Sequence, residues 1–488
     1  MPAHNYVALD LGAESGRVIL GTLSDTDLEM REIHRFANLP VTVSGTLRWN
    51  IPRILDELKS GLRQVAACEP QIESISTDSW GFDYVHFTKN EPMLCLPYHY
   101  RDSRTDGALE KAFAAVPADL IFSETGTQFS QFNTLYQLLD DMKSRPTIIQ
   151  SSEHFLNIGD YFNYLFSGVC RSEASLASTT QLYNPRLRTW SAELIQRFNM
   201  PDRIFAQIVA SGTKLGPLLP TYAEGGLRSA QVVAGCSHDT AAAVAAVPTD
   251  GGDWAYVSSG TWSLLGVELQ EPIINRQSQE HNFTNEVGYG GTIRLLKNLV
   301  GLWIVQECRR EWSRSGREFS YADLAQAAEN ATPLRSLINP ADPRFAKPSG
   351  MPEKITDYCR ETRQDIPQTP GEIVRCTLES LALLYHKTLD EISSVTGYRP
   401  RSLYIVGGGS ENRLLNQLSA NATQMIVLAG PTEATAVGNI LVQAIAMGHL
   451  DSLRDMRRIV RDSFPVTEFR PEDNSVWNDA YDRFQRLP

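Results

Sequence analysis

The hydrophobic pattern of the first half opens with two apolar runs joined by a short, mostly polar stretch. YVALDL (residues 6–11) has the length of a buried strand, and RVILGTL (residues 17–23) resumes the apolar character. This arrangement predicts a hairpin with Gly12 and Gly16 in its turn. Apolar residues at helical spacing then predict a helix over residues 51–67.

Another strand begins in ESISTDSW (residues 73–80). It is expected to turn at Gly81 and to continue to Phe87. Because side chains alternate along a strand, Trp80 and Phe82 would face away from Asp83.

The second half repeats this order of elements. DWAYVSSGTWSLLGVEL (residues 253–269) is again an apolar run, a Ser/Gly/Thr turn and an apolar run. Residues 372–395 have the spacing of a long amphipathic helix, and SLYIVGGG (residues 402–409) predicts a buried strand that ends in three glycines. Residues 433–448 predict another helix, with Gly448 at its end.

The repetition indicates an ancient duplication. We expect two α/β lobes, residues 1–247 and residues 248–488, with a cleft between them. Small-molecule sites usually lie in clefts of this kind.

Composition and net charge indicate which classes of binding partner are not expected. The 488 residues are 42% hydrophobic and 21% charged, with a net charge of −12 and a pI near 5.3. Nucleic-acid binding is not expected, because it would need clustered Lys and Arg. The N-terminus has no secretory pattern and no apolar run reaches membrane-spanning length, so we expect a cytoplasmic protein with no membrane partner. No pattern indicates the oligomeric state.

Seven scattered cysteines include no CxxC and no Cys/His cluster, which argues against structural zinc. Cys359 and Cys376 flank a polar segment. A disulfide and two free thiols both stay open for this pair, and a reducing cytoplasm favours the thiols.

Four segments carry candidate chemistry for phosphoryl transfer, which needs phosphate donors, a metal carboxylate and a base. DLGAESGR ends a strand at Asp10 and offers amides, a hydroxyl and a guanidinium, although an ordinary glycine hairpin fits it equally well. SSGT (residues 258–261) and GGG (residues 407–409) are turns that could hold a nucleotide or simply connect elements. No GxxxxGK[ST] motif and no protein-kinase signature is present.

The fourth segment is SHDT (residues 237–240), which precedes an Ala-rich helical run. Ser237 or Asp239 could be a helix N-cap. Alternatively, Asp239 could be a general base, with His238 as a structural or substrate hydrogen-bonding residue. Spacing alone does not decide between these readings.

Ten motifs in order carry a resemblance over roughly residues 6–470: DLGAESGRV, REIHRF, TDSWGFDYV, YRDSRTDG, FNTLYQL, SHDTA, SSGTWSL, KNLVGLWIVQ, IVGGGSENRLLNQ and EATAVGN. Together they resemble the FGGY family of carbohydrate kinases, within the actin-like ATPase superfamily. The resemblance implies two actin-like (ribonuclease H-like) α/β lobes with ATP and a sugar bound in the cleft.

The resemblance also implies roles for individual residues. Those expected to bind ATP are Ala13, Glu14, Ser15, Gly16, Arg17, Thr261, Gln306 and Gly408, and those expected to bind the sugar are Gly81, Asp83, His238, Asp239, Thr240 and Asn298. Asp239 would be the catalytic proton acceptor, and Asp10 would hold Mg²⁺ through water. Ser259 stands where many actin-like ATPases have Asp, which leaves open whether the second phosphate loop supplies a metal ligand.

The resemblance implies phosphorylation of the C1 hydroxyl of L-rhamnulose by ATP, with another ketose such as L-fuculose or L-xylulose as the alternative. A non-catalytic actin-like ATP-binding protein or a sugar-responsive regulator is the alternative of another class. The WGFDY segment offers Asp83 for sugar hydroxyls and aromatic rings for the methyl group. Phe132 is a further candidate for that apolar contact.

Overall fold

The computed structural model describes residues 3–472 and 475–488, which form two compact units. The first unit runs to Asp250 and adds Glu268–Leu295 and Ala434–Ser463, and the second contains Gly251–Val267, Leu296–Glu433 and the described residues from Phe464 onward. The second half of the chain therefore contributes two segments to the first unit. The lobes expected at residues 1–247 and 248–488 stay a prediction.

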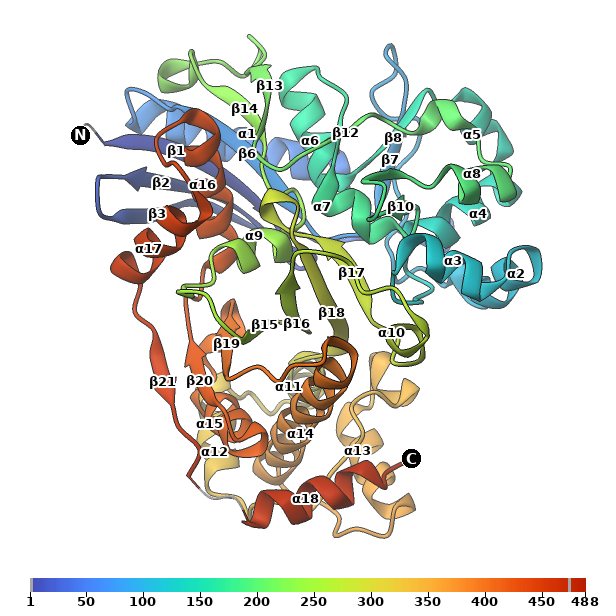
Figure 1. Ribbon diagram of the computed structural model, residues 1–488, viewed down its shortest axis with the longest axis vertical. Coiled ribbons are helices and arrows are strands. Elements are labelled where there is room, and N and C mark those ends of the chain that lie inside the picture. The colour runs from blue at the N-terminus through green and yellow to red at the C-terminus, as the bar shows by residue number, and fades with distance from the viewer. Residues whose placement is uncertain (1–2, 473–474) are drawn as a thin grey trace. The chain divides into compact units, whose positions relative to one another are not determined.

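The first unit is built on a six-stranded mixed sheet with the order β13-β14-β6-β1-β2-β3 (Figure 1). Its strands are β1 (His4–Leu11), β2 (Ser15–Leu23), β3 (Leu28–Ala37), β6 (Ser74–Ser79), β13 (Thr213–Pro217) and β14 (Gln231–Ala234). The strand β1 pairs antiparallel with β2 and parallel with β6. The carboxyl ends of β1 and β6 therefore meet at one edge of the sheet.

The predicted hairpin is confirmed as β1 and β2, but Gly16 does not lie in its turn. Gly12 does, whereas Gly16 is the second residue of β2. A Cβ atom at Gly16 would lie 2.2 Å from Cζ of Phe36 on the neighbouring strand β3. Gly16 is thus needed for close ring packing.

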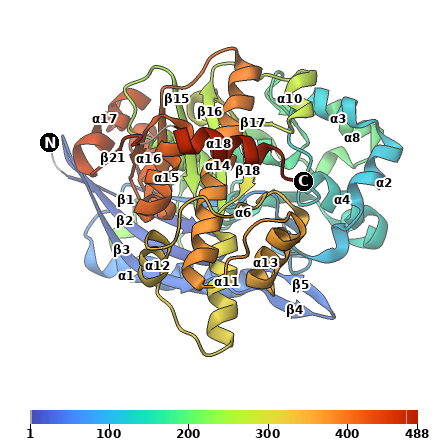
Figure 2. The same cartoon turned by 90° about the horizontal axis from the view of Figure 1, so that it is seen from below.

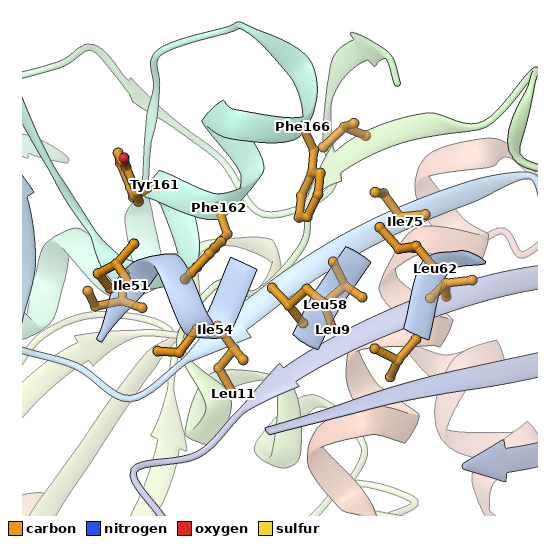
Figure 3. Packing of buried hydrophobic residues seen from close by; sticks show 14 of the residues in the cluster. Leu9, Leu11, Ile51, Ile54, Leu58, Leu62, Ile75, Tyr161, Phe162 and Phe166 are labelled. Atoms are coloured by element: carbon orange, nitrogen blue, oxygen red, sulfur yellow. The ribbon is translucent and has the colours of Figure 1, made fainter. Parts of the chain in front are cut away.

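The two faces of β1 have different environments. Val7, Leu9 and Leu11 belong to a core shared with the helices α1 (Ile51–Cys68) and α6 (Ile158–Ser167), as Figure 3 shows for Leu9 and Leu11. Tyr6 pairs with Gly21 of β2, and a Cβ at Gly21 would lie 2.6 Å from Ile440 of α16 (Ala434–Met447). Alternation therefore places Asp10 on the face that α16 covers.

The predicted helices are confirmed, and their ends have clear local causes. Asn50 caps α1 by accepting a hydrogen bond from the backbone N of Arg53. The long helix α14 (Pro370–Thr396) begins with a capping box between Thr369 and Glu372, and it ends at Gly397. It packs against α12 (Tyr321–Glu329) and α15 (Arg413–Thr423), as seen in Figure 2.

The second sheet has the order β17-β18-β16-β15-β19-β20-β21. Its strands are β15 (Trp254–Ser259), β16 (Trp262–Leu269), β17 (Thr284–Val287), β18 (Ile293–Val300), β19 (Ser402–Val406), β20 (Ile426–Ala429) and β21 (Thr467–Phe469). The β15–β16 hairpin and the buried strand β19 confirm the prediction for this half.

Cys359 and Cys376 are free and buried. A hydrogen bond with Cys376 lowers the pKa of the Cys359 thiol. In the part of the chain that the structure describes, no helix has both the length and the apolar character needed to cross a membrane.

Candidate active site

Asp10 and Arg17 form an ion pair at the end of the first hairpin. They lie opposite each other in the β1–β2 register, and Arg17 Nη2 donates a hydrogen bond to Asp10 Oδ2. Asp10 is 6% exposed. The pair places a carboxylate and a guanidinium beside the turn that is predicted to hold phosphate.

The turn itself is closed by backbone hydrogen bonds. The N–H of Gly12 donates to the carbonyl of Ser15 over 2.9 Å. Asn38, the residue after β3, fixes the turn, because its side chain donates to Gly12 O (2.9 Å) and its backbone N to Glu14 O (3.0 Å). Ala13 and Glu14 are therefore held in a short, defined loop.

Asp78 of β6 is a site residue that sequence patterns do not single out. It lies beside Asp10 in parallel register and is fully buried. Asn439 Nδ2 of α16 donates to Asp78 Oδ2 (2.5 Å), Gln443 Nε2 donates to Asn439 Oδ1 (2.7 Å), and Ser74 donates to Gln443 (2.7 Å). Burial and the charge of Asp10 raise the pKa of Asp78 well above its usual value. In TDSW it reads as an ordinary strand residue, and Asn439 lies 361 positions away.

The carboxylates at this edge suit a magnesium ion. Asp10 raises the pKa of both Asp78 and Asp239, in each case after the larger effect of burial. Asp78 Oδ1 is a buried acceptor for which the described part of the chain supplies no hydrogen-bond partner. Oxygen ligands are what Mg²⁺ prefers, and this ion usually keeps several waters. Because Arg17 already donates to one oxygen of Asp10, contact through water fits these residues.

A second group of possible metal ligands is separate from this edge. The ligand atoms of His4, Glu73 and His449 lie within 4.8 Å of one another. The two imidazole rings are stacked with centroids 3.5 Å apart and planes at 16°, so one ion cannot lie in both ring planes. His4 is also six strand residues from Asp10, about 20 Å away.

Asp239 is the first residue of α9 (Asp239–Ala245), and His238 is its N-cap. Neither Ser237 nor Asp239 is the cap. Asp239 Oδ1 accepts hydrogen bonds from the backbone N (2.5 Å) and the hydroxyl (3.1 Å) of Thr240. Its side chain is 29% exposed, so a ligand can reach it. Burial raises the pKa of Asp239, His238 lowers it, and Asp10 raises it further, leaving it above its usual value.

Buried hydrogen bonds fix the backbone in front of Asp239. The N–H of Ser79, at the end of β6, donates to Ser237 O (2.9 Å). The backbone N of Ser237 donates to Glu173 Oε2 (3.0 Å), and that of His238 donates to Ser175 Oγ (3.1 Å). The predicted residues 237–240 and the end of β6 are therefore brought together.

The imidazole of His238 lies between two acidic residues. Its Nε2 is 3.4 Å from Asp239 Oδ1, and its Nδ1 is 3.4 Å from Glu286 Oε2. Arg294 Nη2 is 3.1 Å from both His238 Nδ1 and Glu286 Oε2. Burial raises the pKa of Glu286, but His238 and Arg294 outweigh it and hold that pKa below its usual value. Sequence patterns give no signal for Glu286 or Arg294.

The strand predicted through Gly81 is interrupted, which corrects the alternation argument. β6 ends at Ser79, β7 begins at Tyr84, and Phe82 between them has φ +77°, in the left-handed region. Trp80 therefore does not face away from Asp83. Its Nε1 donates to Asp83 Oδ2 over 3.0 Å.

Asp83 is fully buried and accepts four hydrogen bonds. Its Oδ2 accepts from Trp49 Nε1 (2.6 Å), Trp80 Nε1 (3.0 Å) and Tyr100 N (3.2 Å), and its Oδ1 accepts from Gln137 Nε2 (3.0 Å). A carboxylate offers about four lone-pair positions, two on each oxygen. Three protein donors saturate Oδ2, while Oδ1 accepts from Gln137 and keeps one position for a further donor. Asp83 therefore holds the indole rings of Trp49 and Trp80 in place. Its contact with the sugar stays a prediction.

The free energy of unfolding of the first unit should depend on pH because Asp83 titrates. Burial raises its pKa to about 6, despite the hydrogen bonds that lower it. Since the folded pKa exceeds the unfolded value near 3.9, this group loses stabilising effect as pH rises between about 4 and 6. Relative to an Asp83→Asn variant, the wild type should lose on the order of 2–3 kcal/mol of unfolding free energy over that range. Urea unfolding of both proteins from pH 4 to pH 7 measures this; a constant difference would contradict it.

Other groups near the Gly81 turn are apolar or tightly packed. A Cβ at Gly81 would lie 3.0 Å from Thr179 Oγ1, a tighter contact than most Cβ atoms make. The rings of Phe82 and Phe132 each make edge contacts with Tyr100, at centroid distances of 6.3 and 5.5 Å. Together they form an aromatic surface beside the turn.

In the second unit, Thr261 lies in the turn between β15 and β16. Thr261 O accepts from the backbone N of Gly301 and of Trp303, the first residue of α11 (Trp303–Arg314), each over 3.2 Å. A Cβ at Gly301 would lie 2.6 Å from the backbone of Trp262. Asn298 lies on β18, three residues before Gly301.

The three glycines after β19 have different surroundings. Gly407 has φ +83°, and a Cβ at Gly409 would lie 1.9 Å from Ser259 Oγ. Around a Cβ at Gly408, no atom of the described residues lies within 4 Å, the two chain neighbours aside. Gly408 is therefore the position at which a ligand can approach the backbone, while Ser259 packs beneath Gly409.

Gln306 lies in the first turn of α11 and carries a buried acceptor. Its Oε1 has no hydrogen-bond partner among the described residues. An unsatisfied buried carbonyl costs about 1–3 kcal/mol, so a donor from a ligand would relieve it. The exocyclic amino group of adenine is such a donor.

Two family models match the chain. The model of the FGGY family of carbohydrate kinases, N-terminal domain, matches residues 5–246, and that of the C-terminal domain matches residues 255–447. The chain is 39% identical over 482 residues to the rhamnulokinase of Bacteroides thetaiotaomicron, covering 99% of both chains. It is 41% identical over 492 residues to that of Pectobacterium atrosepticum, covering 100% of this chain and 97% of the relative.

Solved structures share the fold at low identity. Gluconate kinase from Lactobacillus acidophilus superposes with a TM-score of 0.80 at 14% identity, covering 100% of this chain and 96% of that chain. Plasmodium falciparum glycerol kinase with ADP gives a TM-score of 0.79 at 15% identity, covering 99% and 98%. The expected two-lobe actin-like α/β fold is confirmed.

Proposed function

Because the chain belongs to the FGGY family of carbohydrate kinases, we propose that it transfers the γ-phosphoryl group of ATP to the C1 hydroxyl of L-rhamnulose. The observation that carries the chemistry is the accessible carboxylate of Asp239, held at the start of α9 beside the Gly81 turn. The enzyme is a sugar kinase. The identity of the ketose is supported by relatives that span the whole chain.

Asp239 acts as the general base in this proposal. Its carboxylate takes the proton of the C1 hydroxyl as the hydroxyl oxygen attacks the γ-phosphorus and the bond to ADP breaks. Such a base typically contributes about 10²–10⁴ in rate. The raised pKa of Asp239 makes this carboxylate a stronger base than an ordinary aspartate.

The residues proposed to bind the nucleotide come from four segments of the chain. In the first unit, Ala13, Glu14, Ser15, Gly16 and Arg17 would hold phosphate; in the second, Thr261 would contact phosphate, Gln306 the base and Gly408 the adenosine. Mg²⁺, when bound, would neutralise charge on the phosphates, with Asp10 holding it through water. The buried oxygen donors at Asp10 and Asp78 support this assignment.

The sugar would lie against the Gly81 turn. The hydroxyls of the sugar are proposed to contact Gly81, Asp83, His238, Thr240 and Asn298. The main role of Asp83 is to hold the indole rings of Trp49 and Trp80 in place. The 6-methyl group would meet the aromatic surface that includes Phe132.

A ketose panel tests the substrate assignment. We expect the highest kcat/KM for L-rhamnulose, weaker turnover of L-fuculose and L-xylulose, and essentially none of glycerol. A missing methyl group should cost about 1–3 kcal/mol, whereas a misplaced hydroxyl leaves polar groups unpaired and costs more. ADP release is measured with the purified protein. A higher kcat/KM for D-xylulose or glycerol would overturn the ketose and leave the kinase intact, while ATP turnover that no sugar stimulates would contradict the kinase itself.

A further inference from the structure

Arg294 is a fully buried arginine that contacts the imidazole next to the base. It projects from β18, where it is 0% exposed, and its Nη2 donates to His238 Nδ1 (3.1 Å) and Glu286 Oε2 (3.1 Å). Its Nε and Nη2 also approach Val287 O at 3.4 and 3.3 Å. These four contacts with a Glu, a His and a backbone carbonyl are more than charge neutralisation needs.

The Arg294 contact determines where the His238 proton lies. A guanidinium has five N–H donors, no acceptor, and stays charged in proteins. A hydrogen bond from Arg294 to Nδ1 therefore requires Nδ1 to be the unprotonated nitrogen. The proton of neutral His238 must then be on Nε2, the nitrogen that lies 3.4 Å from Asp239 Oδ1.

In the other tautomer of His238, with the proton on Nδ1, Glu286 could accept a hydrogen bond from that nitrogen. Glu286 Oε2 is 3.4 Å from Nδ1 and would accept a proton placed there. His238 would then present a lone pair at Nε2 to the Asp239 carboxylate, and two acceptors would face each other. By donating to both Nδ1 and Glu286, Arg294 removes this arrangement.

We propose that Arg294 is a positioning residue of the phosphoryl transfer: it fixes His238 as the Nε2–H tautomer, so that this N–H faces the carboxylate of the base. The inference rests on the proposed role of Asp239. The N–H orients the carboxylate and keeps it ionised for proton removal. Arg294 itself touches neither the sugar hydroxyl nor the phosphate in this proposal.

The test combines a spectroscopic readout with kinetics. Protein labelled with ¹⁵N-histidine is examined by long-range ¹H–¹⁵N correlation at neutral pH without substrate, and the His238 signals are identified by their loss in His238→Gln. In the wild type, Nε2 should carry the proton. In Arg294→Met the proton should move to Nδ1, kcat should fall about 10-fold, and the KM for ATP should stay within twofold.

Two matched variants separate tautomer control from loss of packing. Glu286→Gln keeps the Arg294 donor and should keep the Nε2–H form. Arg457→Lys changes another buried arginine, which pairs with Glu268 and contacts the far end of α9 at Val244 and Ala245, and it should leave the His238 signals unchanged.

A wild-type spectrum with the proton on Nδ1, or on both nitrogens, overturns the proposal even if Arg294→Met does not fold. So does an Arg294→Met spectrum that still shows Nε2–H. Failure of the ketose panel would leave these spectra unaffected, which separates this inference from the proposed function.

Discussion

Replacing Asp239 by Asn is expected to lower kcat by about 10²–10⁴ while the KM for the sugar changes little. The amide keeps the size of the side chain and one oxygen, which can still accept the hydrogen bonds of Thr240. It cannot take a proton from the sugar hydroxyl. Initial rates at saturating ATP over a range of sugar concentrations give both constants.

Thermal unfolding provides the control for this variant. Since the backbone before Asp239 is held by Ser79, Glu173 and Ser175, none of which the substitution touches, the melting temperature should stay within a few degrees. A folded Asp239→Asn enzyme that keeps a third of the wild-type kcat would remove Asp239 from the proton transfer.

Replacing Gly408 by Val should raise the KM for ATP by about 10²–10³, with little change in the KM for the sugar. Apart from its two chain neighbours, no described residue has an atom within 4 Å of a Cβ at this position, so the fold accepts the side chain. Adenosine placed against the backbone does not, and displacing it would cost about 3–4 kcal/mol. Both constants are measured on one preparation. If only the sugar KM rises, the adenosine assignment is wrong.

Gly409 is the matched control for steric effects. A methyl group there would overlap Ser259 Oγ, with 1.9 Å between the atoms, so Gly409→Ala should destabilise the second unit by about 1–3 kcal/mol. The two neighbouring substitutions are thus expected to act on different quantities: Gly408→Val on nucleotide affinity and Gly409→Ala on the unfolding free energy. Equal losses of stability would mean that Gly408 is packed in the same way.

Sequence patterns predicted the elements whose signals are local. The two hairpins, the helices α1, α14 and α16, and the buried strand β19 follow from apolar periodicity and from capping residues such as Thr369 and Gly397. The motif order supplied the family, and with it Asp239 and the other candidate residues. These inferences needed no knowledge of distant partners.

The remainder depends on contacts between distant positions. In the sequence, Asp78 looks like an ordinary strand residue, and only the fold brings Asn439 and Gln443 beside it. The role of Arg294 likewise becomes visible only through its contact with His238. The prediction of a continuous strand failed at Phe82 for another reason. A bulky residue with positive φ has no sequence signal, so the strand appeared to run on through the turn.

The first unit cannot be completed during synthesis until the late helix α16 has been made. Gly438 packs so closely against α9 that a Cβ there would lie 1.9 Å from Ala242 O, yet α16 begins at Ala434, 184 positions after Asp250. At about 5–20 residues per second, a ribosome needs roughly 10–40 s to add that stretch. Throughout this time the nascent sheet has one face without its helix, with Tyr6, Ala8, Asp10 and Asp78 on it. That face therefore stays uncovered until α16 has been synthesised and can pack against it.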